Sequence, residues 1–123
     1  MTGARTIRRR VHAFALQLPG AWEDHPWGED VAKVGTKVFA FLGLDDSDDP
    51  GMTVKLRGDS HLHALSVPGA APTGYGLGRS GWVTVPFRGA APPVDVLKDW
   101  VEESYRLVAP KKLVAELDRR PRR

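Results

Sequence analysis

The sequence predicts an α+β domain, a two-layer sandwich in which a mainly antiparallel sheet carries the N- and C-terminal helices on one face. Three observations lead to this prediction. Apolar residues recur with helical spacing near both ends of the chain. Between them lie several short runs that alternate or are rich in β-branched residues. The order of these segments does not repeat strand, helix and strand, so a parallel α/β sheet is not expected.

Length and composition limit the classes of protein to consider. The chain has 123 residues, 41% of them hydrophobic, and we expect a single domain over 1–123, with a core over about 5–117 and a basic tail at 118–123. No apolar run is long enough to span a bilayer, and no apolar segment follows the first arginines, so neither membrane insertion nor export is expected. The chain has no cysteine, which excludes disulfides and thiolate chemistry and favours a cytoplasmic location.

The positive charge is concentrated at the two ends of the chain. The formal net charge is +3, but residues 21–118 hold ten basic and fifteen acidic side chains and sum to −5. The basic residues of the ends are Arg5, Arg8, Arg9, Arg10, Arg119, Arg120, Arg122 and Arg123. If the charge serves a polyanionic partner, that partner is expected to contact the first helix and the tail more than the body of the domain. A short arginine tail is more often a disordered solubilising end than a DNA-binding arm.

The first helix is predicted from a regular apolar face. Its members, spaced as on one side of a helix, are Ile7, Val11, Phe14, Ala15 and Leu18. The residues expected on the outward face are Arg8, Arg9, Arg10, His12 and Gln17. Pro19 and Gly20 are expected to end this helix, because proline disfavours a helical conformation in the residue before it.

A short strand with a turn is predicted over 22–30, and two strands over 31–34 and 37–42 are joined by Gly35 and Thr36. Both alternating sets of residues in 37–42 are apolar. This strand is therefore expected to be central, covered on both faces or covered by helices on one face and by a loop on the other.

The next strand, 52–57, alternates strictly and should present Thr53, Lys55 and Arg57 to solvent. Asp59 is expected to cap a short helix that ends near Leu65.

The chain then returns to strand and helix. A strand is predicted over 82–87, with Trp82 and Thr84 on one face. Pro93 suits the first position of the helix that follows, whose apolar residues recur from 94 to 108. A last short helical segment is predicted over 111–117.

The glycine-rich stretch 74–82 contains a G-x-G-x-x-G pattern at Gly76, Gly78 and Gly81. A dinucleotide-binding loop needs a strand before this pattern and a helix after it. Here a proline-rich loop precedes the pattern and a β-branched run follows. We therefore interpret the glycines as shaping a loop that leads into a strand.

The sequence indicates neither a metal site nor catalysis. His61 and His63 are two residues apart and would lie on different faces of a helix, whereas a zinc pair needs a spacing of three or four. His12 and His25 are isolated in the sequence. No nucleophile elbow or Walker motif is present, so we expect a non-enzymatic protein without a cofactor.

Cations and aromatic residues are expected together on one sheet surface. The candidates are Lys55, Arg57, Arg79, Tyr75 and Trp82, with His25 beside them. A row of Lys and Arg interleaved with aromatic rings fits phosphate contact combined with base stacking. It equally fits an ordinary exposed strand whose tryptophan belongs to the core.

The chain resembles the MmcQ/YjbR proteins through blocks that occur in the same order and spacing up to about Leu117. These blocks are Pro19-Gly20, Pro26-Trp27-Gly28, Lys37-Val38-Phe39-Ala40, Val54-Lys55-Leu56, Gly74-Tyr75-Gly76-Leu77-Gly78-Arg79-Ser80-Gly81-Trp82-Val83 and Glu103-Ser104-Tyr105-Arg106-Leu107-Val108. The chain has Trp27 where the family's turn usually has Phe. It also has Gly78 and Arg79 where the family commonly has a longer polar residue and Lys.

The resemblance implies a frataxin-like (CyaY-like) fold of the double-wing type and a DNA-binding role. Frataxin's link to iron depends on acids of its first helix, which here carries arginines, so the iron role is not transferred. Two hypotheses follow. In the first, a monomeric protein binds DNA, with Arg8, Arg9, Arg10, Lys55, Arg57 and Arg79 contacting phosphates. In the second, a cleft near His25, Tyr75 and Trp82 binds a protein or a small ligand, and nucleic acid plays no part.

Overall fold

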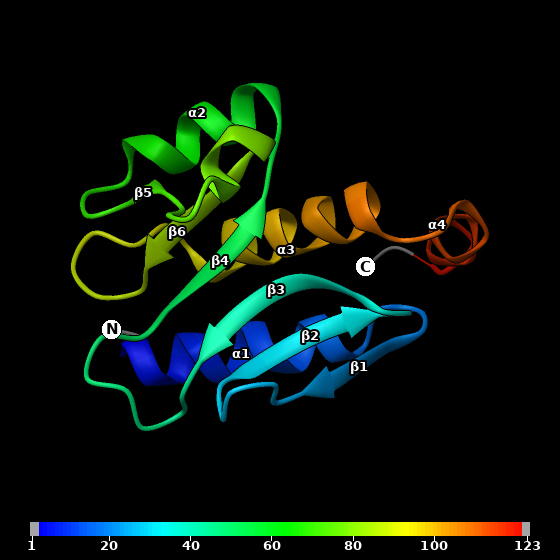
Figure 1. Cartoon of the computed structure of the whole chain (residues 1–123), viewed down its shortest axis with the longest axis horizontal. Helices are drawn as coiled ribbons and strands as arrows, with labels where there is room; N and C mark the ends of the chain where they lie inside the picture. Colours follow the sequence, from blue (N-terminus) through cyan, green and yellow to red (C-terminus); the bar gives the residue numbers. More distant parts are fainter. Residues whose placement is uncertain (1–2, 122–123) are drawn as a thin grey trace.

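The computed structural model describes residues 3–121, which form an α+β fold of four helices and a six-stranded antiparallel sheet (Figure 1). The elements in chain order are α1 (Ala4–Leu16), β1 (Ala21–Asp24), β2 (Asp30–Val34), β3 (Lys37–Gly43), β4 (Gly51–Lys55), α2 (Gly58–Ser66), β5 (Ala71–Pro72), the 3-10 helix η1 (Leu77–Ser80), β6 (Trp82–Pro86), α3 (Val94–Val108) and α4 (Lys111–Asp118). The strand order across the sheet is β1-β2-β3-β4-β6-β5.

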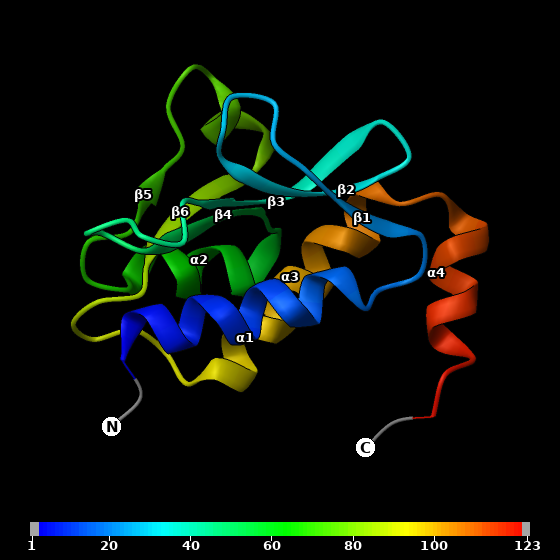
Figure 2. The same cartoon turned by 90° about the horizontal axis from the view of Figure 1, so that it is seen from below.

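The sheet and three helices form two layers. Helices α1, α2 and α3 lie below the sheet in Figure 2, and the opposite face of the sheet is left open. The side chains that fill the space between the layers include Val11, Ala15, Phe39, Val54, Val83, Leu97, Val101 and Tyr105. Burial of a large apolar side chain contributes roughly 1.5–3 kcal/mol, so this layer of contacts holds the helices on the sheet. The predicted two-layer arrangement is confirmed.

The hairpin of β2 and β3 follows the sequence prediction, with Gly35 in a left-handed conformation at the turn (φ +60°). The pairing shifts register between Ala32 and Lys33, which lie opposite Ala40 and Val38. This bulge lets both Phe39 and Ala40 be fully buried in the helix-side core. It explains why both alternating sets of β3 are apolar. Within residues 3–121, helices cover only one face of the strand. On the other face, residues of the loop after β3 line a hollow together with Phe41, which agrees with the second of the two predicted arrangements.

The sheet is split between β3 and β4. Only Ala40 with Val54 and Phe41 with Thr53 are paired across these strands, and the strands then separate (Figure 1). Ser104 of α3 fills the separation. Its Oγ donates to the carbonyl oxygen of Phe39 (2.6 Å) and accepts from the backbone N–H of Lys55 (2.9 Å). A helix side chain thus supplies the hydrogen bonds that the two strands no longer make with each other.

Helix α2 begins without the predicted cap. No side chain caps this helix, and Asp59 lies in its first turn. Instead, Glu103 of α3 accepts hydrogen bonds from the backbone N–H of Arg57 (2.9 Å) and from the hydroxyl of Ser60 (2.7 Å). A carboxylate from a distant helix therefore holds the start of α2, which local sequence patterns do not reveal.

The remaining elements agree with the sequence predictions within one or two residues, except for the 3-10 helix η1 and the strand β5. This two-residue edge strand, with Ala71 opposite Thr84, was not predicted. Pro93 precedes α3 as its N-cap, one residue earlier than expected. None of the helices within residues 3–121 combines the length and apolar character that crossing a bilayer requires.

Candidate nucleic-acid interface

Aromatic side chains lie on the open face of the sheet. Alternation along β6 buries Val83 and Val85 under the helices and turns Trp82 to the opposite face. There the Trp82 ring meets the edge of Phe41, with ring centroids 5.5 Å apart and planes at 72°. Trp22 of β1 lies on the same face and is 44% exposed. Trp82 therefore belongs to a half-exposed aromatic surface and not to the core.

Threonine hydroxyls line this face beside the aromatic pair. The Oγ1 of Thr84 lies 2.9 Å from that of Thr53 and 3.1 Å from that of Thr73, so three neighbouring strand segments share a hydrogen-bonded row. Thr53, Thr84 and Phe41 also line a hollow of about 180 Å³. Hydroxyl groups and an aromatic ring therefore lie together on the open face.

Three cations border the aromatic surface at the end of the β4–β6 pair. Lys55 lies opposite Trp82 in the strand register, and Leu56 donates its backbone N–H to Gly81, which brings the segments of Arg57 and Arg79 together. Lys55 is half-buried, while Arg57 and Arg79 are exposed. In the part of the chain that the structure describes, none of the three side chains pairs with a carboxylate. The cluster is therefore available to an anionic ligand.

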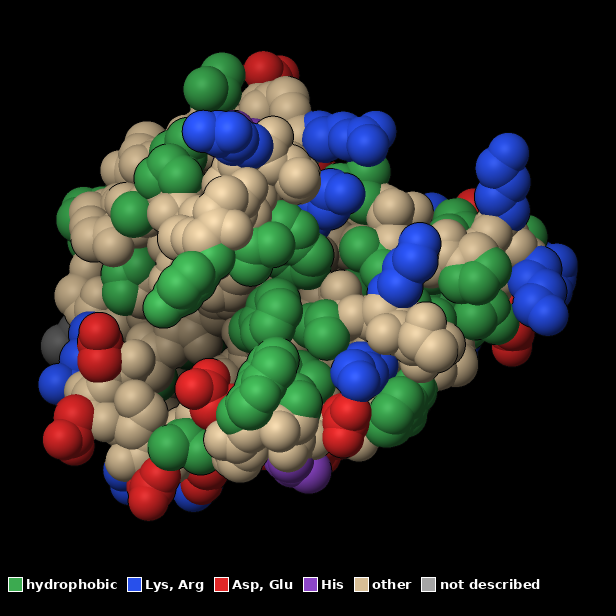
Figure 3. Space-filling model, in the orientation of Figure 1, with side chains coloured by type: hydrophobic (Ala, Val, Ile, Leu, Met, Phe, Trp, Pro, Cys, Tyr) green, Lys and Arg blue, Asp and Glu red, His purple; other side chains and the backbone are tan. Residues whose placement is uncertain are grey.

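The charge on this face is unevenly distributed. Figure 3 shows a band of hydrophobic side chains across its middle, with Lys and Arg gathered along the upper and right margins and Asp and Glu at the lower left. The acidic loop after β3, residues 45–49, accounts for part of the acidic side. A polyanion would be attracted to one part of this face and repelled from the other.

The glycine-rich stretch forms a loop that enters β6, as predicted, and no α-helix begins at it. Gly81 has φ +93°, and a Cβ added there would lie 2.5 Å from the carbonyl oxygen of Leu56. Only glycine allows this close approach of the two backbones. Tyr75 and Gly76 both have positive φ in a turn closed by a hydrogen bond from Leu77 to Gly74. Tyr75 is fully exposed as a result.

Arg8 is not part of an interface, and its predicted outward position is wrong. The side chain is 2% exposed. Its Nε donates to the carbonyl oxygen of Leu42 (2.8 Å), and its terminal nitrogens contact Gly43, Asp30 (2.5 Å) and Asp45. A guanidinium can lie within the buried side of α1 because carbonyl and carboxylate oxygens of β2, β3 and the loop after β3 accept its hydrogen bonds.

The other arginines of α1 lie on the helix side of the molecule. Arg9 is exposed and pairs with Asp45 at 3.2 Å. This hydrogen bond raises the pKa of Arg9 and lowers the pKa of Asp45. Arg10 is exposed and lines a hollow between α1, α3 and α4 together with Lys98 and Glu102. Arg9 and Arg10 therefore belong to the helix layer, whereas Lys55 and its neighbours border the open face of the sheet.

The basic tail is only partly described. Arg119 is exposed, and Arg120 donates to the carbonyl oxygen of Gln17 at the end of α1 (2.5 Å). Arg122 and Arg123 lie outside the described residues. The six terminal arginines that the structure describes are thus divided among a buried ion pair, surface contacts and exposed positions.

The residues of the predicted ligand cleft are not brought together. His25 contacts Glu23 and Asp30, while Trp82 contacts Phe41 and Tyr75 points into solvent. Three hollows formed by the described residues lie elsewhere, beside α1, beside the start of α3 and under the loop after β3. None of these three hollows is lined by His25, Tyr75 or Trp82.

Sequence reasoning missed two members of the open face, Trp22 and Lys33. The Lys33 ammonium lies 5.3 Å from the centre of the Trp22 ring and pairs with Asp24 at 2.7 Å. Lys33 stands between the buried Ala32 and Val34 in β2, a polar residue between two apolar ones. This alternation is the sequence signal that could have placed it on the open face.

Comparisons with known proteins bear on the whole chain. A family model described as YjbR matches residues 16–107. The crystal structure of Deinococcus radiodurans protein DR2400, with a domain described as DUF419, is similar in structure with a TM-score of 0.72 and 24% identity, covering 96% of this chain and 92% of that chain. No curated protein matches the chain significantly. At this level of identity, the likeness to DR2400 establishes a shared fold.

Proposed function

The chain belongs to the YjbR family, and from this premise we propose that it binds DNA without catalysis, on the open face of its sheet. The ligand that this surface suits best is single-stranded DNA. Its bases would stack on Trp82, and its phosphates would contact Lys55, Arg57 and Arg79. The observation that carries the proposal is a half-exposed aromatic pair bordered by three cations that have no carboxylate partner among residues 3–121.

Single strands are favoured over duplex DNA because the aromatic surface is part of a sheet. Bases of a duplex are stacked on one another and do not expose their faces, whereas those of a single strand do. Sheets that bind single strands use aromatic rings as platforms and surrounding cations for the backbone. Phe41 packs edge-to-face with Trp82 and supports the Trp82 ring from one side. Tyr75, fully exposed in the neighbouring loop, provides a further ring for a base.

The helix-side arginines have no role in this proposal. Arg8 is saturated by carbonyls and carboxylates, and Arg9 is held by Asp45. The phosphate contacts are therefore limited to about three, which predicts a modest salt dependence. For a single strand, three neutralised phosphates correspond to a slope of log K against log salt of about −2.

We further propose that the fold is of the frataxin-like (CyaY-like), double-wing type, with the protein acting as a monomer in the cytoplasm. The split sheet supports this, because β1 to β3 and β4 to β6 form two wings joined by two residue pairs. Helices α1 and α3 pack side by side beneath the junction (Figure 2). Size-exclusion chromatography with light scattering tests the monomeric state.

The proposed function is tested by anisotropy of a fluorescent oligothymidine of about twelve nucleotides, enough to span one small binding surface. Trp82→Leu keeps an apolar side chain but removes the stacking surface. Loss of stacking with one base costs about 1–3 kcal/mol, so the Kd should rise by roughly fivefold to more than a hundredfold. Trp27→Leu is the matched control, because Trp27 is 81% exposed in the turn between β1 and β2.

Two results would contradict the proposal. One is the absence of binding to single-stranded and duplex DNA at low salt. The other is equal affinity of the wild-type chain and the Trp82→Leu variant for the single strand. Circular dichroism of both variants establishes that the comparison is made between folded proteins.

A further inference from the structure

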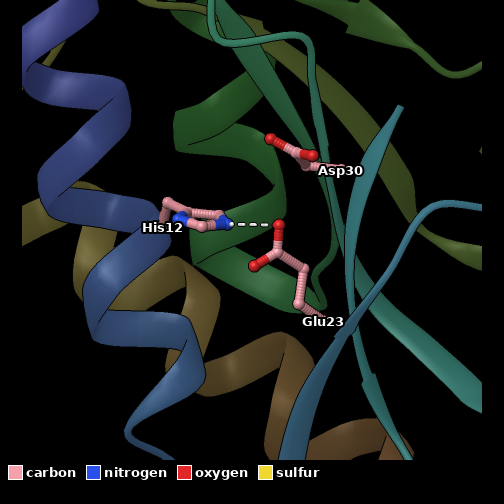
Figure 4. A group of neighbouring side chains, drawn as sticks. All are labelled: His12, Glu23 and Asp30. Atoms are coloured by element: carbon pink, nitrogen blue, oxygen red, sulfur yellow. Dashed lines mark ion pairs between the residues drawn. The ribbon is translucent and has the colours of Figure 1, made fainter. Parts of the chain in front are cut away.

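A second group of polar side chains lies between α1 and the first two strands, away from the open face. Figure 4 shows His12 from α1, Glu23 from β1 and Asp30 from the start of β2 reaching toward one another. Glu23 lies opposite Ala32 in the pairing of β1 with β2, and Asp30 lies two residues before Ala32, so both side chains point to the same face of the sheet as Ala32. Because Ala32 is part of the core, both carboxylates face the helix layer. His25, two residues after Glu23, joins them from the β1–β2 turn.

The distances between these groups are short. His12 Nε2 lies 3.4 Å and His25 Nε2 lies 3.3 Å from the same carboxylate oxygen, Glu23 Oε1. His25 Nδ1 lies 2.9 Å from Asp30 Oδ1. One ligand atom each from His12, Glu23 and Asp30 can be chosen so that all lie within 4.8 Å of one another. His12, Glu23 and Asp30, which come from three elements, thus converge, and His25 contacts both carboxylates from the β1–β2 turn.

We propose that His12, Glu23 and Asp30, with His25 as a fourth ligand, form a binding site for a divalent transition-metal ion, of which zinc is the best match. A tetrahedral zinc ion holds nitrogen and oxygen ligands at about 2.0–2.2 Å, which places neighbouring ligand atoms about 3.4 Å apart. The His12–Glu23 separation already has this value. The wider separations require side-chain movements on the order of 1 Å, which rotation of half-exposed side chains allows.

The state of His12 supports a ligand at this point. Its Nε2 is inaccessible to solvent and forms no hydrogen bond with any described residue, and its contact with Glu23 Oε1 is 3.4 Å long. Buried side-chain nitrogens nearly always form a hydrogen bond, and leaving one unmade costs about 1–3 kcal/mol. A metal ion between His12 and Glu23 would replace this long contact with a coordinate bond.

Arg8 orients the carboxylate of Asp30. It binds Asp30 Oδ2 at 2.5 Å, which leaves Oδ1 directed at His25. Burial tends to raise the pKa of Asp30, but the hydrogen bond and charge of Arg8 lower it. Hydrogen bonds of this kind orient metal ligands in proteins. With both imidazoles neutral, Glu23, Asp30 and Arg8 leave one net negative charge, which favours a cation.

The ligand types select the class of metal. Calcium and magnesium prefer oxygen ligands only, whereas imidazole nitrogens combined with carboxylates suit zinc and its neighbours in the first transition series. His25 is 52% exposed at its side chain, so an ion can enter from solvent on that side.

The test is isothermal titration of the metal-free full-length chain with zinc chloride at pH 7.5. We expect one zinc ion per chain and a rise in melting temperature with zinc. His12→Ala and Glu23→Gln should each weaken binding at least about tenfold. Glu29→Gln, an exposed carboxylate of the same turn, and His63→Gln, on α2, are the matched controls and should bind as the wild type does.

Two results would overturn the proposal: no zinc binding by the wild-type chain, or equal binding by the wild type, His12→Ala and Glu23→Gln. If His12→Ala does not fold, the imidazole resonances of the wild type decide the matter. Zinc should shift the signals of His12 and His25 and leave that of His63 in place. Unshifted His12 and His25 signals would also overturn it.

Discussion

The Arg8 side chain lies between α1 and the hairpin of β2 and β3, where it links four backbone or carboxylate oxygens of three segments. Desolvation of the guanidinium is offset by these contacts, because each is a hydrogen bond to a full or partial negative charge. The same residue holds Asp30, one of the proposed zinc ligands. A single buried charge therefore supports both the packing of the first helix and the second site.

We expect Arg8→Met to destabilise the chain by about 3 kcal/mol, because it leaves Asp30 and two carbonyls without their donor while retaining most of the side-chain volume. The free energy of unfolding in urea measures this. Arg10→Met on the same helix is the control, since an exposed substitution should change stability by about 0.5 kcal/mol or less. Equal effects of the two substitutions would contradict a structural role for Arg8.

At the scale of the elements, α3 holds the two halves of the sheet together. Ser104 is completely buried and connects the backbones of β3 and β4 where the strands separate. The next residue, Tyr105, packs edge-to-face on Phe39, and its hydroxyl donates to the carbonyl oxygen of Pro19 (2.5 Å). The helix thus fixes the separation of the strands, the position of the loop after α1 and the support of the aromatic face.

Ser104→Ala should lower the free energy of unfolding by about 2 kcal/mol, because the Phe39 carbonyl and the Lys55 N–H remain buried without a partner. The effect should appear as a lower urea midpoint with an unchanged m value. Ser66→Ala, in which an exposed hydroxyl is removed from the end of α2, is the control. A loss below about 0.5 kcal/mol would mean that water replaces the hydroxyl and that Ser104 does not join the strands.

At the scale of the whole molecule, the two layers separate its exposed cations into two groups. Lys55, Arg57 and Arg79 border the open face, and the exposed arginines of α1 belong to the helix layer. Net charge alone attracts a polyanion to both groups, whereas the proposed site uses one.

Two triple substitutions to alanine distinguish these alternatives. Replacing Lys55, Arg57 and Arg79 removes the same charge as replacing Arg5, Arg9 and Arg10. We expect the first triple variant to weaken binding of oligothymidine at least about tenfold at low salt and to flatten the salt dependence, because it removes about three phosphate contacts. The second should bind nearly as the wild type does. Equal losses in the two variants would show that binding follows net charge, and a reversed order would place the interface on the helix layer.

Local patterns were sufficient for most of the secondary structure. The apolar periodicity of α1 and α3, the turn at Gly35 and the alternation of β4 and β6 each depend on neighbouring residues, and the chain forms these elements as predicted. The neighbouring residues of the glycine-rich stretch also predicted that a strand, and not a helix, follows it, as the structure shows. The short β5 was not predicted, because two residues carry too little periodicity to indicate a strand.

The placement of charged and aromatic residues needed the tertiary structure. The helical periodicity of the sequence predicts that Arg8, directly after the buried Ile7, lies on the surface. Its burial is favourable only because carbonyl and carboxylate oxygens of β2, β3 and the following loop accept its hydrogen bonds. His12 and His25 are distant from each other in sequence and meet Glu23 only because α1 lies across the first two strands.

The sequence by itself determined the α+β class, the elements and the family to which the chain belongs, because these depend on periodicity and on short blocks in a fixed order. Only the tertiary structure decided which face of the sheet is open, that Trp82 lies on it, and that the basic residues are divided between two sides. Those properties depend on contacts between segments far apart in the chain, and a local sequence pattern does not show which distant segments will come into contact.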